Sequence, residues 1–184
     1  NLWLPVFVCI ASKYLITLNG KHFFNPSLFA FCICLLLGEE FITLAPAYQW
    51  YGSAETAWLM GLFIITGALF LFVFKINRGW LIFSFLFVFF LQTLLRANIM
   101  EHIIPWQTLV LSSITSPAFY LFTFYMITDP ATSPKGRREQ ILVGVFIALF
   151  DLVFHLKFSL YTFFFAGITV AAIRYIYLLA KAFW

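Results

Sequence analysis

The chain has very little charge, and this scarcity excludes most classes of soluble protein. Only 10% of its 184 residues are Asp, Glu, Lys or Arg, against about 25% in ordinary soluble domains. Hydrophobic residues make up 64% of the chain, and 26 residues are Phe. The composition therefore predicts a protein embedded in a lipid bilayer, where apolar side chains face acyl chains and neighbouring helices.

Cysteines and metal-ligand clusters are also few. Cys9, Cys32 and Cys34 all lie in apolar runs, which is not the pattern of a disulfide framework. We interpret them as buried packing residues; a cluster shared with another subunit is the alternative. The sequence contains no His and Glu residues at metal-ligand spacing, no nucleophile elbow and no Gly-rich phosphate loop. We therefore predict no metal site and assign no catalytic residue.

Seven apolar runs separate the polar segments, and we interpret them as membrane-spanning helices, which need roughly 20 residues each. The last two are joined by a very short link and are expected to form an antiparallel pair. The predicted fold class is all-α: a polytopic integral membrane protein with one transmembrane helical domain over residues 1–184. Because an apolar run begins at once without a methionine, we expect this domain to be the later part of a longer subunit. The seven segments are Leu2–Leu18, Asn25–Leu44, Ala54–Phe74, Trp80–Leu95, Trp106–Ile127, Ile141–Phe158 and Leu160–Leu179.

Lysine and arginine are unevenly divided between the two sides of this predicted bundle. If all seven segments cross, nine of the 11 positive residues lie on one side and two, Arg96 and Lys157, on the other. The positive-inside rule then places the C-terminus in the cytoplasm. This topology accounts for the net charge of +4, and without a basic face outside the bilayer we expect no nucleic-acid partner. The nine are Lys13, Lys21, Lys75, Arg78, Lys135, Arg137, Arg138, Arg174 and Lys181.

Polar residues inside the predicted helices are candidates for an ion or proton path, because they are costly in a bilayer unless paired. Asp151 would lie about 15 Å from the start of its helix, near the middle of a core about 30 Å thick. His155 shares its helix face. The alternative for this pair is a hydrogen-bonded contact that fixes the helix to a neighbour, and Gln92 is expected to make an interhelical hydrogen bond.

Glu39 and Glu40 are the other two candidates for such a path. They follow Gly38 in the outer third of the second predicted helix. Either one of them lines a cavity, or the helix breaks at Gly38 and leaves both near the outer headgroups.

Two prolines mark the ends of predicted helices, and each follows a residue that can accept hydrogen bonds from unpaired helix amides. Asn25 precedes Pro26, and Asp129 precedes Pro130, so both are expected to anchor the cytoplasmic face. Cations at positions 135, 137 and 138 lie close enough in sequence to neutralise Asp129.

The stretches around these prolines together resemble a known family. The first is Lys13–Pro26, and the second is Thr128–Thr132, which reads Thr-Asp-Pro-Ala-Thr and is followed by Lys-Gly-Arg. They resemble the NqrB/RnfD family, the membrane subunits of the sodium-pumping NADH:quinone reductase and of the Rnf electron-transport complex. The resemblance implies a subunit of the bacterial inner membrane, with Asn25, Thr128 and Asp129 as candidate cofactor-binding residues.

The flavin attachment motif of that family is where this chain departs from the pattern. Family members carry FMN esterified to a threonine in a Ser/Thr-Gly-Ala-Thr motif preceded by an aspartate. The corresponding stretch here contains Thr56, but Glu55 replaces the alanine, and the glycine and aspartate are absent. The resemblance therefore implies a divergent relative in which covalent FMN is not expected, while a noncovalent flavin or a quinone stays open.

Two functions from different classes are consistent with the sequence. One is a membrane subunit of a redox-linked electron-transport complex, coupled to ion translocation and in contact with lipid and other membrane subunits. The other is a non-redox anchor, scaffold or channel-like subunit that keeps only the fold. Whether the chain is itself an enzyme is left open.

Overall fold

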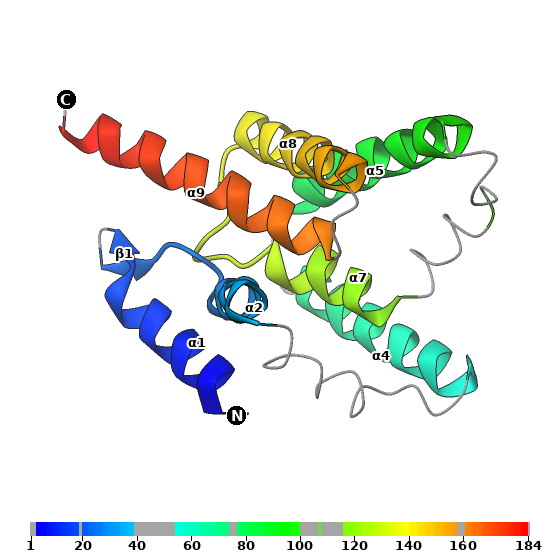
Figure 1. Cartoon of the computed structure of the whole chain (residues 1–184), viewed down its shortest axis with the longest axis horizontal. Helices are drawn as coiled ribbons and strands as arrows, with labels where there is room; N and C mark the ends of the chain where they lie inside the picture. Colours follow the sequence, from blue (N-terminus) through cyan, green and yellow to red (C-terminus); the bar gives the residue numbers. More distant parts are fainter. Residues whose placement is uncertain are drawn as a thin grey trace.

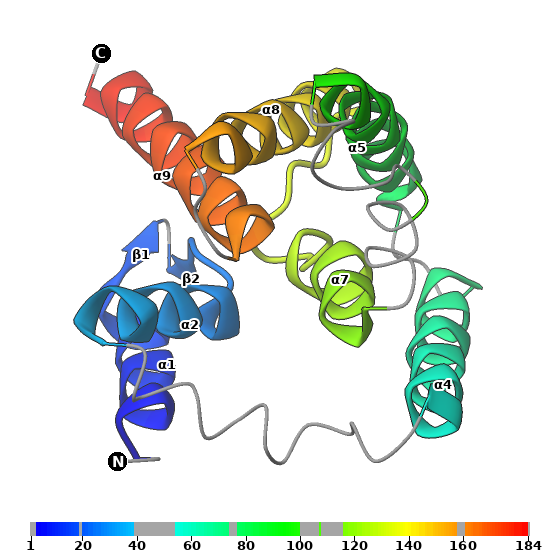
Figure 2. The ribbon, with the colours of Figure 1, turned by 45° about the vertical axis from the view of Figure 1, so that its right-hand side comes forward.

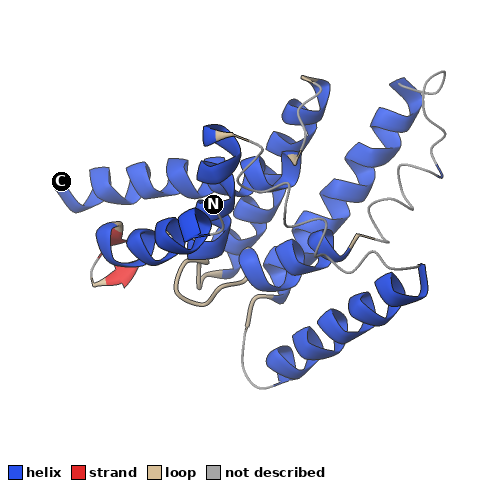
Figure 3. Cartoon of the chain, turned by 60° about the horizontal axis from the view of Figure 1, so that its bottom comes forward, coloured by secondary structure: helices blue, strands red, loops and turns tan. Residues whose placement is uncertain are grey.

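The computed structural model describes residues 3–18, 20–38, 54–73, 77–99, 107, 116–157 and 161–183. Most of this part of the chain is helical (Figure 3). Helix α5 lies against α8, α8 lies against α9, and the α1–α2 pair contacts α9 (Figures 1 and 2). The elements are α1 (Trp3–Leu15), β1 (Thr17–Leu18), β2 (Lys21–His22), α2 (Pro26–Leu37), α4 (Ala54–Val73), α5 (Gly79–Ile99), α7 (Pro117–Leu121), η2 (Phe122–Met126), α8 (Arg137–Leu156) and α9 (Thr162–Phe183).

Three of these helices, α5, α8 and α9, are long and apolar enough to cross a membrane. The predicted all-α membrane fold is therefore confirmed. Helices α1 and α2 have 13 and 12 residues, fewer than the roughly 17 that a crossing needs. In the fifth predicted segment, Trp106–Ile127, the structure describes Gln107 and then every residue from Ser116 onward. Seven crossings thus stay a prediction.

A small antiparallel hairpin connects α1 to α2, and the apolar pattern does not predict it. Its two strands have two residues each, and Gly20 has a φ of 75°, which glycine adopts without steric cost. The predicted first helix, Leu2–Leu18, is too long, because α1 ends at Leu15. The β-branched residues Ile16 and Thr17 before an Asn-Gly pair favour a strand and a tight turn over another helical turn.

The contacts between helices fix their relative directions. Helices α5 and α8 run parallel, since Asn77 and Gln140 meet at their starts while Gln92 and Asp151 meet near their ends. Helices α8 and α9 form the antiparallel pair that their short link predicts. This alternation is the one expected of a chain that crosses a bilayer and returns.

The core is a cluster of phenylalanine rings where α5, α7, η2 and α9 meet. Its central rings belong to Phe85, Phe89, Phe119 and Phe122, with centroids between 4.8 and 6.0 Å apart. Such pairs contribute about 0.5–1.5 kcal/mol beyond burial. Gly144 lets α8 approach α5 closely, because a Cβ there would lie 2.6 Å from a backbone oxygen of α5. This core separates two polar regions, one at the loop after η2 and one between the ends of α5 and α8.

Candidate functional site

The first polar region begins at Asn25, which caps α2. Its Oδ1 accepts a hydrogen bond from the Leu28 N–H at 3.0 Å, and Pro26 begins the helix. This is the helix start that the Asn-Pro pair predicts. The same side chain donates from Nδ2 to Asp129 Oδ2 at 3.4 Å, across 104 positions of sequence. Asn25 therefore fixes both its own helix and a distant loop.

Asp129 is the other half of this contact. Its Oδ1 accepts from the Ala131 N–H at 3.0 Å, which makes an Asx turn after η2. Its Oδ2 lies 3.5 Å from His22 Nε2. We call His22, Asn25 and Asp129 the motif clasp, because it joins in space the two stretches that resemble family motifs.

Thr128, the third candidate for cofactor binding, faces the interior. It is 2% exposed, and its hydroxyl donates to the Phe124 carbonyl oxygen one turn earlier. This hydrogen bond satisfies a free carbonyl at the end of η2. In this arrangement the threonine side chain stabilises a helix terminus.

The basic residues at this end hold the loop, and they do not pair with Asp129. Within the described chain, the basic group that lies within 4.0 Å of the Asp129 carboxylate is His22. The prediction that the cations at positions 135, 137 and 138 neutralise Asp129, which was based on their proximity in sequence, is therefore wrong. Arg78 Nε donates to Ser133 Oγ at 2.6 Å, and Arg174 Nη1 donates to the Thr132 carbonyl oxygen. The cations that the charge count assigns to different loops thus meet on one loop.

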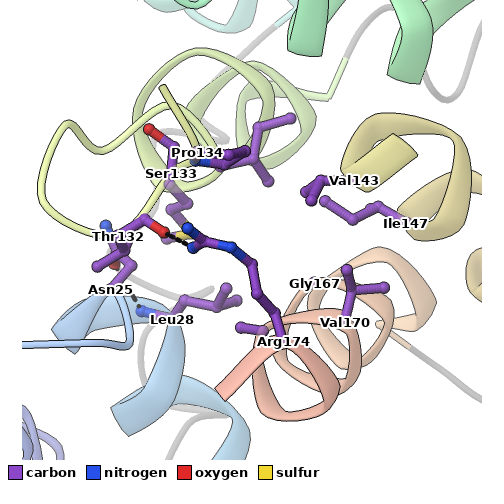
Figure 4. A pocket seen from close by; sticks show the side chains of 13 residues that line it. Asn25, Leu28, Thr132, Ser133, Pro134, Val143, Ile147, Gly167, Val170 and Arg174 are labelled. Carbon is purple, nitrogen blue, oxygen red and sulfur yellow. Dashed lines mark hydrogen bonds between the residues drawn. The ribbon is translucent and has the colours of Figure 1, made fainter. Parts of the chain in front are cut away.

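A small cavity lies beside the motif clasp, and Arg174 reaches across it to Thr132 (Figure 4). Its volume is about 40 Å³. A bound water needs about 10–15 Å³, whereas pockets for cofactor-sized ligands measure about 300–1,000 Å³. The cavity is therefore large enough for a few waters and smaller than a flavin. Residues that line it include Asn25, Leu28, Thr132, Ser133, Pro134, Val143, Ile147, Gly167, Val170 and Arg174.

The second polar region lies between α5 and α8, and we call it the Asp151 cluster. It comprises Gln92, Thr93, Arg96, Asp151 and His155. Asp151 is fully buried, and its Oδ2 accepts a hydrogen bond from Gln92 Nε2 at 2.7 Å. Buried Arg96 donates from Nη2 to Thr93 Oγ1 at 3.2 Å and interacts electrostatically with Asp151. Opposite charges in one dehydrated space offset part of the cost of burying each.

Part of the hydrogen-bonding capacity of this cluster is unused. Within the described residues, Gln92 Oε1, Arg96 Nε and Asp151 Oδ1 are buried without a hydrogen-bond partner. His155 Nδ1 lies 3.4 Å from Asp151 Oδ1, but it is closer, at 3.0 Å, to the Asp151 carbonyl oxygen. Each unpaired buried group costs about 1–3 kcal/mol. A hydrogen-bonding partner at these atoms would remove that cost.

Two features of this cluster differ from the sequence-based expectation. The topology assigns Arg96 to an outer loop, yet it is 5% exposed; its spacing of four from Gln92 is the signal that puts both on one helix face. Helix α8 begins at Arg137, four residues before Ile141. Asp151 therefore lies about 21 Å from the start of α8, and not about 15 Å, and about 8 Å from its end; its depth in the bilayer stays a prediction.

The remaining candidates lie largely outside the described part. Helix α2 ends before Gly38, where a break was one of the two alternatives, but Glu39 and Glu40 are outside the described residues. Thr56 lies in the first turn of α4, and its side chain is likewise outside. The described residues contain no group of three His, Cys, Asp or Glu that could hold a metal ion.

The cysteines of α2 pack inside the protein. Cys32 and Cys34 are 1% and 0% exposed, and Cys32 Sγ lies 3.5 Å from the Phe164 carbonyl oxygen on α9. Both behave as small apolar residues at a helix–helix contact.

The fold and the two polar regions define a polytopic α-helical membrane protein whose loops and buried polar groups connect distant segments. Residues 49–173, about two thirds of the chain, match the NQR2, RnfD, RnfE family. The chain belongs to this family. The matched range contains Asp129 and the whole Asp151 cluster, and it does not select between NqrB and RnfD. Comparisons with curated proteins and with solved structures gave no match.

Proposed function

We propose that the protein is an integral membrane subunit of a redox-linked electron-transport complex. The observation that carries this proposal is the family match over residues 49–173. The contact between Asn25 and Asp129 supports it, because the two family-like stretches form one structural unit. Other membrane subunits of the complex and the surrounding lipid are its partners.

The proposed orientation puts the motif clasp on the cytoplasmic side of a bacterial inner membrane. The positive-inside rule assigns the loops with most Lys and Arg to that side. Contacts from Arg78 to Ser133 and from Arg174 to Thr132 bring cations of two distant segments to the loop after η2. The C-terminus, at the end of α9, would lie on the same side.

We assign the motif clasp a structural role in this subunit. Each of its side chains is engaged with a helix start, a turn or another clasp residue, and the cavity beside it is too small for a flavin. Asn25, Thr128 and Asp129 would hold the cytoplasmic loop in a shape that a partner subunit recognises.

The Asp151 cluster is our candidate for coupling electron transfer to ion movement. Asp151 is buried, and one of its oxygens has no hydrogen-bond partner in the described part. A carboxylate of this kind can take up a proton or a cation and release it when the charge nearby changes. Arg96 is buried in the same cluster, and its charge acts on Asp151.

The test is redox-driven ion uptake into membrane vesicles, expressed per electron transferred. Asp151→Asn keeps an oxygen that can accept from Gln92 and removes the charge, so we expect electron transfer to continue while uptake per electron is lost. Glu139→Gln makes the same change at an exposed position of α8 and should leave coupling unchanged. If Asp151→Asn leaves ion uptake per electron unchanged, the cluster has only a structural role, which is to hold α5 and α8 together.

A non-redox anchor or scaffold is the second candidate, favoured by the small cavity at the motifs. It predicts that the purified complex shows no visible absorbance change on reduction that depends on this chain. A chromophore that is reduced by the complex's own donor and is lost when this subunit is deleted would exclude the anchor.

A further inference from the structure

The unpaired atoms of the Asp151 cluster indicate which kind of ion it can take up. Asp151 and Gln92 are 0% and 2% exposed, and a hydrogen bond from Gln92 Nε2 to Asp151 Oδ2 joins them at 2.7 Å. The other oxygen of each side chain, Asp151 Oδ1 and Gln92 Oε1, has no hydrogen-bond partner in the described chain. Both atoms are acceptors, so what this pair lacks is a donor.

A proton on Asp151 would supply that donor. An ionised carboxylate only accepts hydrogen bonds, whereas a protonated carboxyl group also has one O–H donor. With the proton on Oδ1, the carboxyl group can donate to Gln92 Oε1 while its Oδ2 still accepts from Gln92 Nε2. The acid and the amide then form a pair with two hydrogen bonds, and one proton satisfies both unpaired oxygens.

A metal cation fits the same cluster less well. A proton and a monovalent cation add the same charge beside Arg96, so the available ligands decide between them. Hard cations such as Ca²⁺ and Mg²⁺ take about six oxygen ligands or more. The buried side-chain oxygens of this cluster that lack a partner in the described chain are the two of the pair. The third unpaired atom, Arg96 Nε, is a donor and does not bind cations.

His155 connects this buried pair to the surface. Its side chain is 32% exposed, whereas that of Asp151 is 0% exposed. His155 Nδ1 lies 3.4 Å from Asp151 Oδ1, which is the oxygen that needs the proton. His155 Nε2 lies 3.4 Å from Thr162 Oγ1 at the start of α9. Because an imidazole can accept a proton at one nitrogen and release one from the other near neutral pH, this ring can carry protons to Asp151.

The charged and titratable groups described around Asp151 are Arg96 on α5 and His155 on α8 itself. Arg96 is 5% exposed and interacts electrostatically with the carboxylate. From α9, Thr162 contacts the cluster through His155, and Lys157, just beyond α8, is exposed. Since a guanidinium keeps its charge in proteins, a proton can move between His155 and Asp151.

We propose, building on the function proposed above, that the ion exchanged by the Asp151 cluster is a proton, held between Asp151 Oδ1 and Gln92 Oε1 and delivered through His155. A proton from the surface binds His155 Nε2, the N–H bond at Nδ1 breaks, and an O–H bond forms at Asp151 Oδ1; release reverses these steps. Gln92 is then a positioning residue that selects a proton over a metal cation. His155 lies at the end of α8 opposite the basic loop, so the exchange takes place toward the outer side in the proposed orientation.

Infrared difference spectroscopy of the full-length protein, purified in mild detergent and titrated with acid, tests the choice of ion. A protonated carboxyl group has a carbonyl stretch that a carboxylate lacks. We expect such a band to appear reversibly as the pH falls, to be absent in Asp151→Asn and to persist in Glu139→Gln, which changes an exposed carboxylate on the same helix. Replacing choline with sodium or potassium at constant pH should leave the band unchanged. Loss of the band on addition of sodium or potassium, or the absence of any band that depends on Asp151, would overturn the proposal.

Two variants test the pair and the route. Gln92→Leu removes the hydrogen bond to the carbonyl oxygen Oδ2, so the Asp151 band should shift to higher frequency. After a pH jump, the band should form on the order of 100-fold more slowly in His155→Gln, and at the wild-type rate in Lys157→Gln. An unshifted band in Gln92→Leu would exclude the pair, and an unchanged rate in His155→Gln would exclude the route.

These spectra separate the inference from the function on which it builds. The wild-type titration decides between a proton and a metal cation whether or not Gln92→Leu folds. None of the infrared measurements needs an electron donor, so their failure would leave the proposed electron-transport role standing. Conversely, a complex without reducible groups would disprove that role without changing the Asp151 band.

Discussion

Replacing Asp129 with alanine should destabilise the protein through three contacts at once. The substitution removes the acceptor of the Ala131 N–H, at 3.0 Å, and the partner of Asn25 Nδ2, at 3.4 Å. It also removes the carboxylate that lies 3.5 Å from His22 Nε2. Because the first contact is short and the other two are long, most of the loss comes from the Asx turn.

The expected size follows from these distances. Loss of a hydrogen bond to a charged acceptor costs about 1.5–3 kcal/mol, and a partly exposed ion pair adds about 0–1 kcal/mol. We expect the free energy of unfolding to fall by about 2 kcal/mol in Asp129→Ala. Asp129→Asn keeps the Oδ1 acceptor and loses the charge, so its loss should be about 1 kcal/mol or less.

Thermal unfolding in detergent, with a denaturant series where it is reversible, measures these losses. For a chain of this size, 1 kcal/mol corresponds to about 2–4 °C in Tm, so the alanine variant should melt about 4–8 °C lower. A double-mutant cycle with Asn25→Ala should show a coupling of about 0.5–1 kcal/mol. Thr66→Ala removes an exposed side-chain bond on α4 and should combine additively with Asp129→Ala.

Two results would refute this reasoning. Additive losses for Asn25→Ala and Asp129→Ala would show that the contact across the motif clasp contributes nothing. Normal melting of both Asp129 variants with loss of electron transfer would place Asp129 in a cofactor or ion site.

Three further predictions concern packing, topology and flavin. Gly144→Ala should lower the free energy of unfolding by about 1–3 kcal/mol through overpacking, because its Cβ would lie 2.6 Å from Leu81 O and 2.9 Å from Phe85 N. Gly79→Ala has open space around it and should melt normally; equal melting of the two variants would show that the helices separate easily. Cysteines introduced as Tyr51→Cys and His102→Cys should react with an impermeant reagent in intact cells, and Gly136→Cys should not; labelling at position 136 would invert the topology. Denatured protein should show no in-gel flavin fluorescence, and a fluorescent band that disappears in Thr56→Ala would reveal a covalent flavin.

Local chemistry at helix ends was predictable from sequence. An Asn before a Pro predicts the start of α2, and an Asp before a Pro predicts the turn after η2, because each follows from neighbours within a few residues. The antiparallel pairing of α8 and α9 follows from the shortness of their link. The polarity and spacing of Asp151 and His155 also indicate a buried polar site.

The partners of these groups were not predictable, because they come from distant segments. Nothing near Asp129 in the sequence indicates His22, and the adjacent cations are better candidates until the fold places them elsewhere. Arg96 reads as a loop charge when spans are counted by hydropathy, although it joins a buried cluster. The hairpin before α2 is likewise hidden, because its strands are too short to produce an alternating pattern.

The central claim, that this chain is a membrane subunit of an electron-transport complex, is tested most directly by isolating it from native membranes through an affinity tag. Difference spectra of the isolated complex, oxidised and then reduced, should show redox groups that the complex's own donor reduces. Membranes that carry a deletion of this chain should lack that reduction, and the full-length chain should restore it. Isolation of this chain alone, or with partners that contain no reducible group, would contradict the claim.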